Sequence, residues 1–450
     1  MTSKEIIKQL LTEDQAESIL RFWPSLIASE KQMLIKQVEN LDQERLKQQL
    51  RLVHQSSHPV DFEPFEDFAH SGNPKDLEMG KQLIRSGKVG CIILAGGQGT
   101  RLGFEGPKGL YPTSLVRHKS LFQICFEKVL AAGKQVGRRL MVSVMTSPEN
   151  DTVTRKFLSD HDYFGLKPSQ VSFFSQNNLP LLDKDGHLFL EKTYKFAEGP
   201  DGNGQCFHNF VKAGLWEDWK NLGIQYINVI LIDNPLADPF DAELIGFHTR
   251  KHAHITVKCT QKVQPEEKVG VMVREGEHAR IIEYSELSDI EKYSMLDGRL
   301  KYCCANLSLF CFSMDFAGSV VEKHPHLPLH KAWKATKYVN EMGVTQASKS
   351  AIAWKFEHFI FDLTRYTSKV AALLYPREAC FAPLKNYSGQ DSITSVQMAL
   401  QKRDRDIYQA VTGLSPPQHK FELAPEFYYP TADLLAKWKG RSTEDAYIEG

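Results

Sequence analysis

From residue 89 onward, short apolar runs alternate with stretches whose apolar residues recur at helical spacing, and this alternation limits the possible folds most. The apolar runs cover residues 89–95, 140–145, 171–174 and 226–232. The helical stretches between them cover residues 120–132, 151–159 and 209–221. Buried parallel strands are continuous apolar runs joined by helical crossovers, so we predict a doubly wound α/β fold with a mixed, mainly parallel sheet.

The regions on either side of this alternation differ in character. The first residues have helical spacing, and residues 54–74, rich in Pro, His, Asp and Gly, are typical of a linker. After residue 262 we expect antiparallel strands at 270–274, 279–284 and 306–312, and then helices at 352–374. We therefore predict three parts, which are an N-terminal helical region 1–85, a central domain 86–375 and a small C-terminal mixed domain 376–450.

Composition excludes several classes of partner. The 450 residues include 55 Lys plus Arg and 55 Asp plus Glu, so no overall charge attracts nucleic acid or an anionic membrane. No apolar stretch approaches the roughly 18 residues that span a bilayer, and the N-terminus does not resemble a secretory signal. The eight cysteines are scattered without a CxxC pair. We expect a cytoplasmic protein without nucleic-acid or membrane partners, whose oligomeric state the sequence does not predict.

The glycine-rich stretch 94–112 follows the first apolar run directly. Its glycines leave backbone amides open to a phosphate or a base, and Arg101 and Lys108 add positive charge. A dinucleotide-binding loop would open straight into a helix, but Pro107 and Pro112 keep this chain non-helical until about residue 120. A P-loop requires Gly-Lys-Ser/Thr, and Lys108 lies instead in Pro-Lys-Gly. The sequence therefore disfavours nicotinamide enzymes and P-loop kinases or ATPases.

Residues 94–112 contain LAGGQGTRLG followed by PKGLYP, and this pair of motifs resembles eukaryotic-type UDP-N-acetylglucosamine pyrophosphorylases, within the wider UDP-sugar pyrophosphorylase (UDPGP type 1) group. The resemblance covers roughly residues 88–390. Further segments agree in order, namely Met145-Thr146-Ser147, Phe174-Ser175-Gln176, Pro200-Asp201-Gly202-Asn203-Gly204, Ile232-Asp233-Asn234, Glu283-Tyr284-Ser285-Glu286, Phe359-Ile360-Phe361-Asp362 and Pro383-Leu384-Lys385-Asn386. It implies a Rossmann-like, GT-A-like nucleotidyltransferase fold, with catalysis in the central domain.

The resemblance also implies a reaction and the residues that bind its substrates. UTP and N-acetylglucosamine 1-phosphate would give UDP-N-acetylglucosamine and pyrophosphate. The implied nucleotide-binding residues are Leu94, Ala95, Gly96 and Gly97 through their backbone, Lys108 and Lys355 toward UTP, and Gln176 and Gly202 toward uracil. The implied sugar-binding residues are Asn203, Glu283, Tyr284 and Asn306, with Lys385 on the sugar phosphate.

Asp233 follows the apolar run 226–232, and ligands of open α/β sheets lie at the carboxyl ends of parallel strands. One carboxylate with phosphate oxygens and water suits Mg²⁺, so we expect Asp233 to bind Mg²⁺ and the nucleotide. The attacking phosphate oxygen is already anionic, so no protein nucleophile is needed. We predict catalysis by alignment and charge neutralisation, carried by Arg101, Lys108, Lys385 and Mg²⁺.

The sequence does not decide which sugar 1-phosphate is the substrate. The family usually has Asn-Ala-Gly-Asn where this chain has Cys303-Cys304-Ala305-Asn306. This change leaves glucose 1-phosphate and galactosamine derivatives open as substrates, and a UTP:glucose-1-phosphate uridylyltransferase is the first alternative. A non-catalytic nucleotide-sugar sensor or scaffold is the second, although such a protein would not need every charged residue named above.

Overall fold

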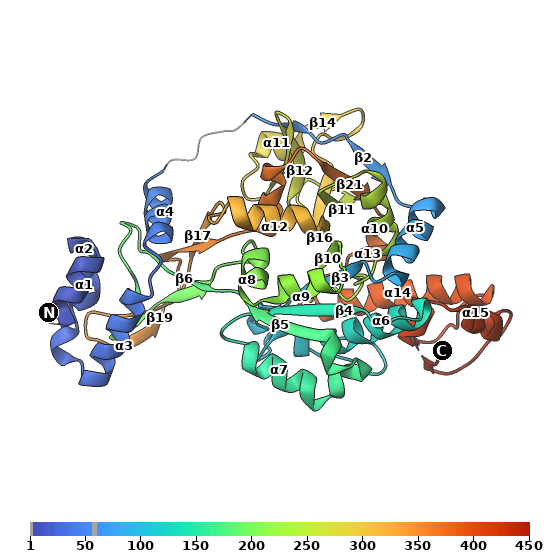
Figure 1. Ribbon diagram of the computed structural model, residues 1–450, viewed down its shortest axis with the longest axis horizontal. Coiled ribbons are helices and arrows are strands. Elements are labelled where there is room, and N and C mark those ends of the chain that lie inside the picture. Colours follow the sequence, from blue (N-terminus) through green and yellow to red (C-terminus); the bar gives the residue numbers. More distant parts are fainter. Residues whose placement is uncertain (1–2, 56–60) are drawn as a thin grey trace. The chain divides into compact units, whose positions relative to one another are not determined.

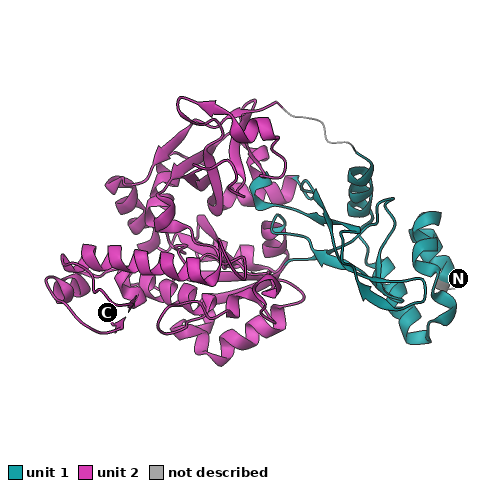
Figure 2. Cartoon of the chain, turned by 180° about the vertical axis from the view of Figure 1, so that it is seen from behind, with its two compact units in different colours: residues 1–60, 176–205, 324–362 teal, residues 61–175, 206–323, 363–450 magenta. Residues whose placement is uncertain are grey.

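The computed structural model describes residues 3–55 and 61–450 (Figure 1). The chain forms two compact units, each built from segments that are distant in sequence (Figure 2). Unit 1 takes its residues from 1–60, 176–205 and 324–362, and unit 2 from 61–175, 206–323 and 363–450. The two units are described separately below.

Unit 2 contains the predicted α/β sheet. This sheet has eleven strands. Eight of them lie side by side in the order β2 (Phe68–His70), β21 (Val370–Leu374), β11 (Ile255–Gln261), β16 (Cys304–Ser313), β10 (Tyr226–Leu231), β3 (Val89–Leu94), β4 (Met141–Thr146) and β5 (Val171–Ser175). β10, β3, β4 and β5 pair in parallel, while β16 runs antiparallel to β10 and β11. The remaining three are β1 (Glu63–Pro64), β12 (Val271–Glu275) and β13 (His278–Ile282). The predicted α/β fold is confirmed.

Helices connect these strands where the apolar spacing predicts them. Ser120 accepts a hydrogen bond from the Gln123 amide and so caps α6 (Leu121–Val136). Gly214 has a φ of 79° and divides the predicted helix 209–221 into two helices. The helices of unit 2 besides α6 are α5 (Pro74–Arg85), α7 (Asp151–Asp160), α8 (Cys206–Lys212), α9 (Leu215–Asn221), α10 (Ala242–Arg250), α11 (Asp289–Tyr293), α12 (Met314–Lys323), α13 (Arg377–Cys380), α14 (Ile393–Thr412) and α15 (Ala432–Trp438).

The expectation of helices over residues 352–374 is wrong. These residues form β20 (Ala353–Glu357), the 3₁₀ helix η6 (Ile360–Tyr366) and β21. An apolar run such as that of β21 does not by itself separate a buried strand from a buried helix, and here pairing with β11 decides. Part of the expected linker 54–74 also forms strands, β1 and β2, while residues 56–60 lie outside the described residues.

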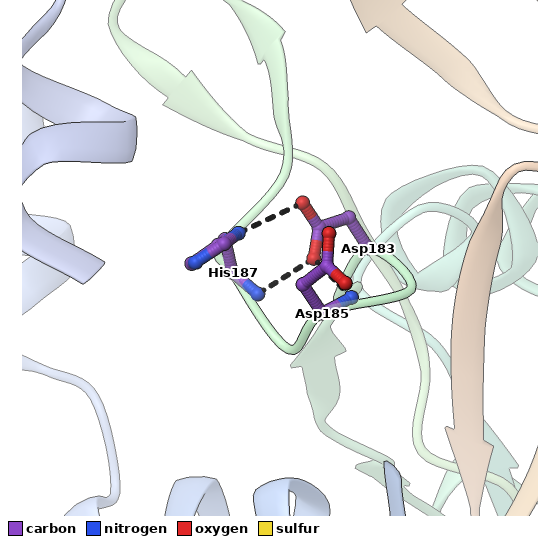
Figure 3. Close-up of side chains that lie close together, drawn as sticks. All are labelled: Asp183, Asp185 and His187. Carbon is purple, nitrogen blue, oxygen red and sulfur yellow. Dashed lines mark hydrogen bonds and ion pairs between the residues drawn. The ribbon is translucent and has the colours of Figure 1, made fainter. Parts of the chain in front are cut away.

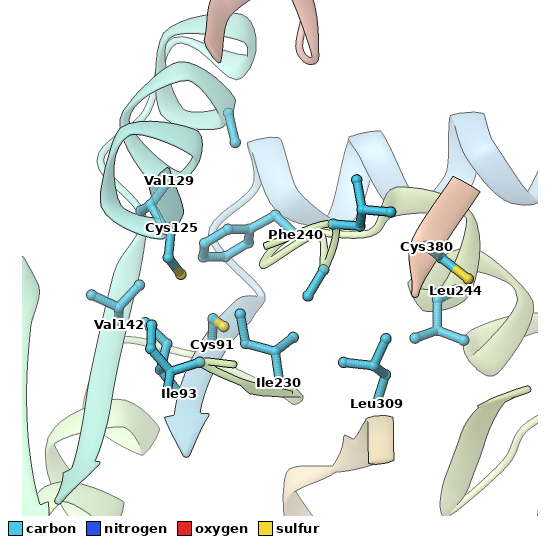
Figure 4. Packing of buried hydrophobic residues seen from close by; sticks show 14 of the residues in the cluster. Cys91, Ile93, Cys125, Val129, Val142, Ile230, Phe240, Leu244, Leu309 and Cys380 are labelled. Atoms are coloured by element: carbon cyan, nitrogen blue, oxygen red, sulfur yellow. The ribbon is translucent and has the colours of Figure 1, made fainter. Parts of the chain in front are cut away.

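The core of unit 2 lies between the sheet and its helices. Cys91 and Ile93 point to the same face of β3 and pack with Cys125 and Val129 of α6 in one apolar cluster (Figure 4). All four side chains are buried. Full burial of an aliphatic side chain contributes about 1.5–3 kcal/mol to stability relative to exposure. This packing therefore stabilises β3, the strand that leads into the glycine-rich stretch 94–112. All eight cysteines are free and buried.

Unit 1 combines the predicted N-terminal helices with hairpins from the middle of the chain. Leu34, Phe196 and Phe356 share one buried cluster that joins helices and hairpins. The helices are α1 (Ser3–Leu10), α2 (Glu13–Leu20), α3 (Ala28–Glu39) and α4 (Gln43–His54). The strand pairs are β6 (Asn178–Pro180) with β9 (Glu198–Pro200), β7 (Leu190–Lys192) with β8 (Lys195–Phe196), β17 (His330–Lys334) with β20, and β18 (Lys337–Val339) with β19 (Thr345–Ala347).

Two smaller pairs complete the strands of unit 2. They are β14 (Met295–Leu296) with β15 (Arg299–Leu300), and β22 (Glu422–Leu423) with β23 (Tyr447–Ile448). Residues 407–448 contribute a separate buried hydrophobic cluster, which includes Tyr408 and Trp438. Within the described ranges 3–55 and 61–450, no helix has the length and apolar character needed to cross a membrane.

Candidate functional site

The glycine loop of unit 2 begins where β3 ends. The Ala95 amide donates to the Met145 carbonyl at 2.8 Å, which extends the pairing of β3 with β4. The Asn150 side-chain amide donates to the Ala95 carbonyl at 3.0 Å. The loop then closes on itself, because the Lys108 amide donates to the Gly97 carbonyl at 3.1 Å. These hydrogen bonds therefore fix the backbone conformation of Leu94 to Gly97, the four residues predicted to bind the nucleotide through their backbone.

The glycines of this loop differ in what surrounds them. A Cβ added at Gly109 would lie 2.2 Å from the Phe122 ring, so packing against α6 requires that glycine. A Cβ added at Gly97 would meet no heavy atom within 4 Å. The protein itself has no steric need for glycine at position 97, which is consistent with close approach of a ligand to that backbone.

Lys108 and Asp233 meet at the carboxyl ends of β3 and β10. Lys108 Nζ lies 3.3 Å from Asp233 Oδ2, and both side chains are largely buried. The other carboxylate oxygen, Asp233 Oδ1, is buried without a hydrogen-bond partner among the described residues. A buried carboxylate oxygen that lacks a donor is suited to a metal ion or to water on a metal ion. The parallel register of β3 and β10 brings these two residues together across a large sequence separation.

The segment that carries Lys385 is attached to Asp233 through the backbone. The Leu384 amide donates to the Asp233 carbonyl at 2.8 Å. Asn234 adds two bonds to the same segment, accepting from the Ala382 amide at 3.0 Å and donating to the Cys380 carbonyl at 2.8 Å. The structure thus brings the Lys385 segment to the Lys108–Asp233 pair. Sequence reasoning missed Asn234, whose only signal was its place directly after Asp233.

Lys385 and Arg101 are available for a ligand. Neither side chain forms an ion pair or hydrogen bond with another residue that the structure describes, although Lys385 Nζ lies 5.5 Å from the Phe381 ring centroid. Arg101 lies in the 3₁₀ helix η2 (Thr100–Leu102) and is exposed. No hydrogen bond or ion pair among the described residues joins Arg101 to Lys108 or Asp233.

Near Lys385, the carboxyl group of Asp391 has an altered environment. Burial raises the pKa of Asp391 above its ordinary value, and the positive charge of Lys385 acts in the opposite direction. The Asp391 carbonyl also accepts the Lys385 amide at 2.7 Å. Sequence reasoning missed Asp391. Its carboxylate lies close to Lys385 in sequence but forms no ion pair with it, and no local pattern predicts this arrangement.

The predicted sugar-binding residues of unit 2 gather around Gly270. The Asn306 amide donates to the Gly270 carbonyl at 2.9 Å, and a Cβ added at Gly270 would lie 3.1 Å from Glu283 Oε1. The Asn306 side chain accepts the Ser308 amide at 2.9 Å, and Ser308 has a φ of 56°. Asn306 therefore also holds a kink in β16. Tyr284, the next residue after Glu283, is exposed.

The predicted site residues of unit 1 are Gln176 after β5, Gly202 and Asn203 on one loop, and Lys355 on β20. Gly202 has a φ of 83° and forms a bridge with His358, whose carbonyl oxygen would lie 2.3 Å from an added Cβ. The Asn203 side chain accepts the Ile360 amide at 2.9 Å. Gln176 is buried, and Lys355 Nζ pairs with Glu357 at 2.9 Å. The loop 201–204 is thus anchored on residues 358–360 within this unit.

An ion pair that sequence reasoning missed lies under the same loop. Asp201 is fully buried, and its Oδ2 lies 3.8 Å from Arg45 Nη1 on α4. Burial raises the pKa of Asp201 to about 7, while the Arg45 charge opposes this rise. No sequence signal links Arg45, in the N-terminal helices, to the Pro-Asp-Gly-Asn-Gly motif.

A group of potential metal ligands in unit 1 was also not predicted. Asp183, Asp185 and His187 place one ligand atom each within 4.8 Å of the others (Figure 3). Asp183 accepts the His187 amide at 2.8 Å and contacts His187 Nδ1 at 3.0 Å. These bonds close the tight turn at Gly186, so the turn itself accounts for the arrangement.

Comparisons with known proteins identify the family. The family model described as UTP–glucose-1-phosphate uridylyltransferase matches residues 31–425. The chain belongs to this family. It is 34% identical to UDP-N-acetylglucosamine diphosphorylase 1 of Arabidopsis thaliana over 412 residues, covering 86% of this chain and 80% of that protein. It is 30% identical to UDP-N-acetylglucosamine pyrophosphorylase of Saccharomyces cerevisiae over 409 residues, covering 85% and 86%.

A solved structure supports the same assignment. The uridine diphosphate N-acetylglucosamine pyrophosphorylase from Trypanosoma brucei, in complex with an inhibitor, superposes with a TM-score of 0.81. The two chains share 26% sequence identity, and the match covers 100% of this chain and 98% of that one. The resemblance that the LAGGQGTRLG and PKGLYP motifs indicated is confirmed, and so is the nucleotidyltransferase fold.

Proposed function

We propose that this protein is a nucleotidyltransferase that converts UTP and N-acetylglucosamine 1-phosphate to UDP-N-acetylglucosamine and pyrophosphate. The observation that carries the proposal is the cluster at the carboxyl ends of β3 and β10, where Lys108 lies 3.3 Å from Asp233 and the Lys385 segment is bonded to Asp233. The relatives named above are called N-acetylglucosamine enzymes, which supports this sugar over glucose.

In this reaction a phosphate oxygen of the sugar 1-phosphate attacks the α-phosphorus of UTP. A new P–O bond forms, and the bond from the α-phosphorus to the β-phosphate oxygen breaks with its electron pair leaving on pyrophosphate. Two polyanions must be aligned and the negative charge on the leaving group neutralised. We assign the charge neutralisation to Lys108, Lys385 and the exposed Arg101, and the backbone of residues 94–97 to the nucleotide.

We further propose that Asp233 holds Mg²⁺, which would neutralise charge on the phosphates when bound. The buried oxygen Asp233 Oδ1, which lacks a hydrogen-bond partner among the described residues, fits this assignment. A single carboxylate suffices because Mg²⁺ usually keeps several waters and takes further ligands from substrate phosphates. Lys108 would meanwhile keep the carboxylate oriented.

The remaining contacts belong to the same proposal. Gln176 and Gly202 would bind uracil and Lys355 would contact UTP. Asn203, Glu283, Tyr284 and Asn306 would bind the sugar. The positions of Glu283 and Asn306 on either side of Gly270 support the assignment of these two residues. We also propose a cytoplasmic location without nucleic-acid or membrane partners, which the eight free cysteines support.

Pyrophosphate release tests the function directly. The protein is incubated with UTP, Mg²⁺ and one of three sugar 1-phosphates, carrying N-acetylglucosamine, N-acetylgalactosamine or glucose, with EDTA as the control for metal. We expect release with N-acetylglucosamine 1-phosphate preferred and none in EDTA. Preference for glucose would keep the reaction but show that Cys303 to Ala305 reshape the sugar pocket. No release despite UTP binding would favour the sensor or scaffold.

A further inference from the structure

Asn150 lies between the end of β4 and the start of α7, and its side chain is fully buried. An asparagine directly before a helix usually accepts a hydrogen bond from an amide of the first turn. The Asn150 side chain caps no amide of α7. Its Nδ2 instead donates to the Ala95 carbonyl of the glycine loop at 3.0 Å and lies 3.5 Å from the Gly97 carbonyl. A residue in a capping position therefore holds the loop rather than the helix.

Both ends of the Asn150 side-chain amide match their surroundings. Nδ2 faces the carbonyls of Ala95 and Gly97, while Oδ1 accepts the Ser147 amide at 2.8 Å. A side-chain amide offers a donor and an acceptor at once. Aspartate at this position would keep the acceptor for Ser147 but would place its second oxygen against two carbonyl oxygens. Among side chains of this size, asparagine alone satisfies both sets of contacts.

The contacts of Asn150 set the direction of two peptide groups in the loop. In a planar trans peptide, the C=O and N–H groups point in opposite directions. Because Asn150 holds the Ala95 carbonyl, the Gly96 amide points away from Asn150. The weaker contact with the Gly97 carbonyl does the same for the Gln98 amide. One buried side chain thus controls where two amides of the glycine loop point.

The amides of this part of the loop are left for a ligand. Those of Gly96, Gly97 and Gln98 donate no hydrogen bond to any residue that the structure describes. Gly97 is exposed, and the two residues on either side of it are half-buried. Successive backbone amides of a turn can bind an anion. The fold does not use these three donors, so their directions matter only to a ligand.

We propose that Asn150 is a positioning residue for the nucleotide, which holds the Ala95 and Gly97 carbonyls so that the amides after them point at oxygens of UTP. The inference rests on the proposed nucleotide role of residues 94–97 and adds to the site a residue from outside the loop. Asn150 acts through the backbone of the loop, because its own side chain is fully buried and its polar atoms are already bonded.

Asn150→Ala and Asn150→Asp test this role in the full chain. The first variant removes both contacts, whereas the second keeps the acceptor for Ser147 and removes only the donor to the loop. We expect Kd for UTP, measured with Mg²⁺ by isothermal titration calorimetry, to rise about fivefold or more in both variants. In the pyrophosphate assay, KM for UTP should rise by a similar factor, while KM for N-acetylglucosamine 1-phosphate should change by less than about twofold.

Gln170→Ala is the matched control. The Gln170 side chain is buried and has the same bonding pattern, because it accepts the Lys167 amide at 3.1 Å and donates to the Leu140 carbonyl at 2.9 Å. It lies at the amino ends of β4 and β5, at the opposite edge of the parallel strands from the glycine loop. Gln170→Ala should lower Tm about as much as Asn150→Ala but change Kd for UTP by less than about twofold.

Three results would overturn the role of Asn150. They are wild-type affinity for UTP in Asn150→Asp, an equal loss of affinity in Gln170→Ala, and a wild-type chain that does not bind UTP. Asn150→Ser, whose shorter side chain would not reach the Ala95 carbonyl, replaces either Asn150 variant if Tm shows that it does not fold. A wild type that binds UTP but releases no pyrophosphate contradicts the proposed function, while the Kd values of the variants still decide whether Asn150 positions the loop.

Discussion

Two glycine loops assigned to the nucleotide differ in what makes the glycine necessary. At Gly97 an added Cβ meets no heavy atom within 4 Å, whereas at Gly202 it would lie 2.3 Å from the His358 carbonyl oxygen. The backbone of Gly202 also has a φ of 83°, which disfavours any side chain. Glycine at 97 thus leaves space for a ligand, and glycine at 202 serves the folding of its own loop. A glycine motif in a sequence does not distinguish these two cases.

The charged residues of the two loops differ in the same way. Asp233, beside the first loop, keeps a carboxylate oxygen without a hydrogen-bond partner among the described residues. Asp201, in the second loop, is fully buried and pairs with Arg45 of the N-terminal helices. The first carboxylate is therefore placed for a ligand, and the second connects parts of unit 1.

Among the substitutions predicted below, Gly202→Ala should lower stability most. Backbone strain and the contact with the His358 carbonyl together should cost roughly 2–3 kcal/mol. Such a loss should lower Tm by about 4–10 °C in a thermal unfolding experiment. Gly343→Ala is the matched control in unit 1, because Gly343 has a φ of 80° but only ordinary contacts around an added Cβ. Equal Tm losses in the two variants would remove packing as the reason for Gly202.

Asp233→Asn and Lys108→Ala should act on turnover rather than on stability. Each should lower kcat at least tenfold, which is about 1.4 kcal/mol of transition-state stabilisation. Pyrophosphate release measures kcat, and Tm verifies folding. Asp160→Asn, an exposed change on α7, is the control for the loss of a carboxylate. Unchanged kcat in both site variants would rule out the proposed mechanism.

Gly97→Ala should reverse the pattern of Gly202→Ala. Because no protein atom opposes the added methyl group, Tm should change by less than about 2 °C. The methyl group would instead obstruct the nucleotide, so KM for UTP should rise at least fivefold, about 1 kcal/mol. Steady-state kinetics over a range of UTP concentrations measures this. A normal KM with normal stability would mean that UTP does not approach this backbone.

The smallest effect concerns pH. The pKa of Asp201 is raised to about 7 in the folded protein, above its ordinary value of 3.8. Between these values the folded state holds a proton that the unfolded chain has released, so this group's contribution to stability falls as pH rises from about 4 to 7 and is constant above. Asp201→Asn removes the titration, so Tm of the variant minus Tm of the wild type should increase between pH 5 and pH 8. A constant difference would show that Asp201 ionises normally.

Much of unit 2 could be predicted from local pattern. The strands β3, β4, β5 and β10 and the helices α6 and α7 lie close to their predicted positions, because continuous apolar runs and helical spacing reflect burial directly. The pattern failed over residues 352–374, where apolar residues fit either a helix or a strand and the pairing of β21 with β11 decides. The sequence analysis divided the chain into three consecutive parts, whereas each of the two compact units is assembled from three segments that are separated in sequence.

The sequence by itself determined the family, the glycine loop and the residue types of the charged cluster, since these depend on residues that lie close together along the chain. Only the tertiary structure placed Lys108 at Asp233, joined the Lys385 segment to it through Asn234, and set Arg45 beside Asp201. It also separated Gly97 from Gly202, because the space around a backbone position is filled by residues far away in sequence. Pairing and packing over such separations depend on the whole fold, which no local pattern contains.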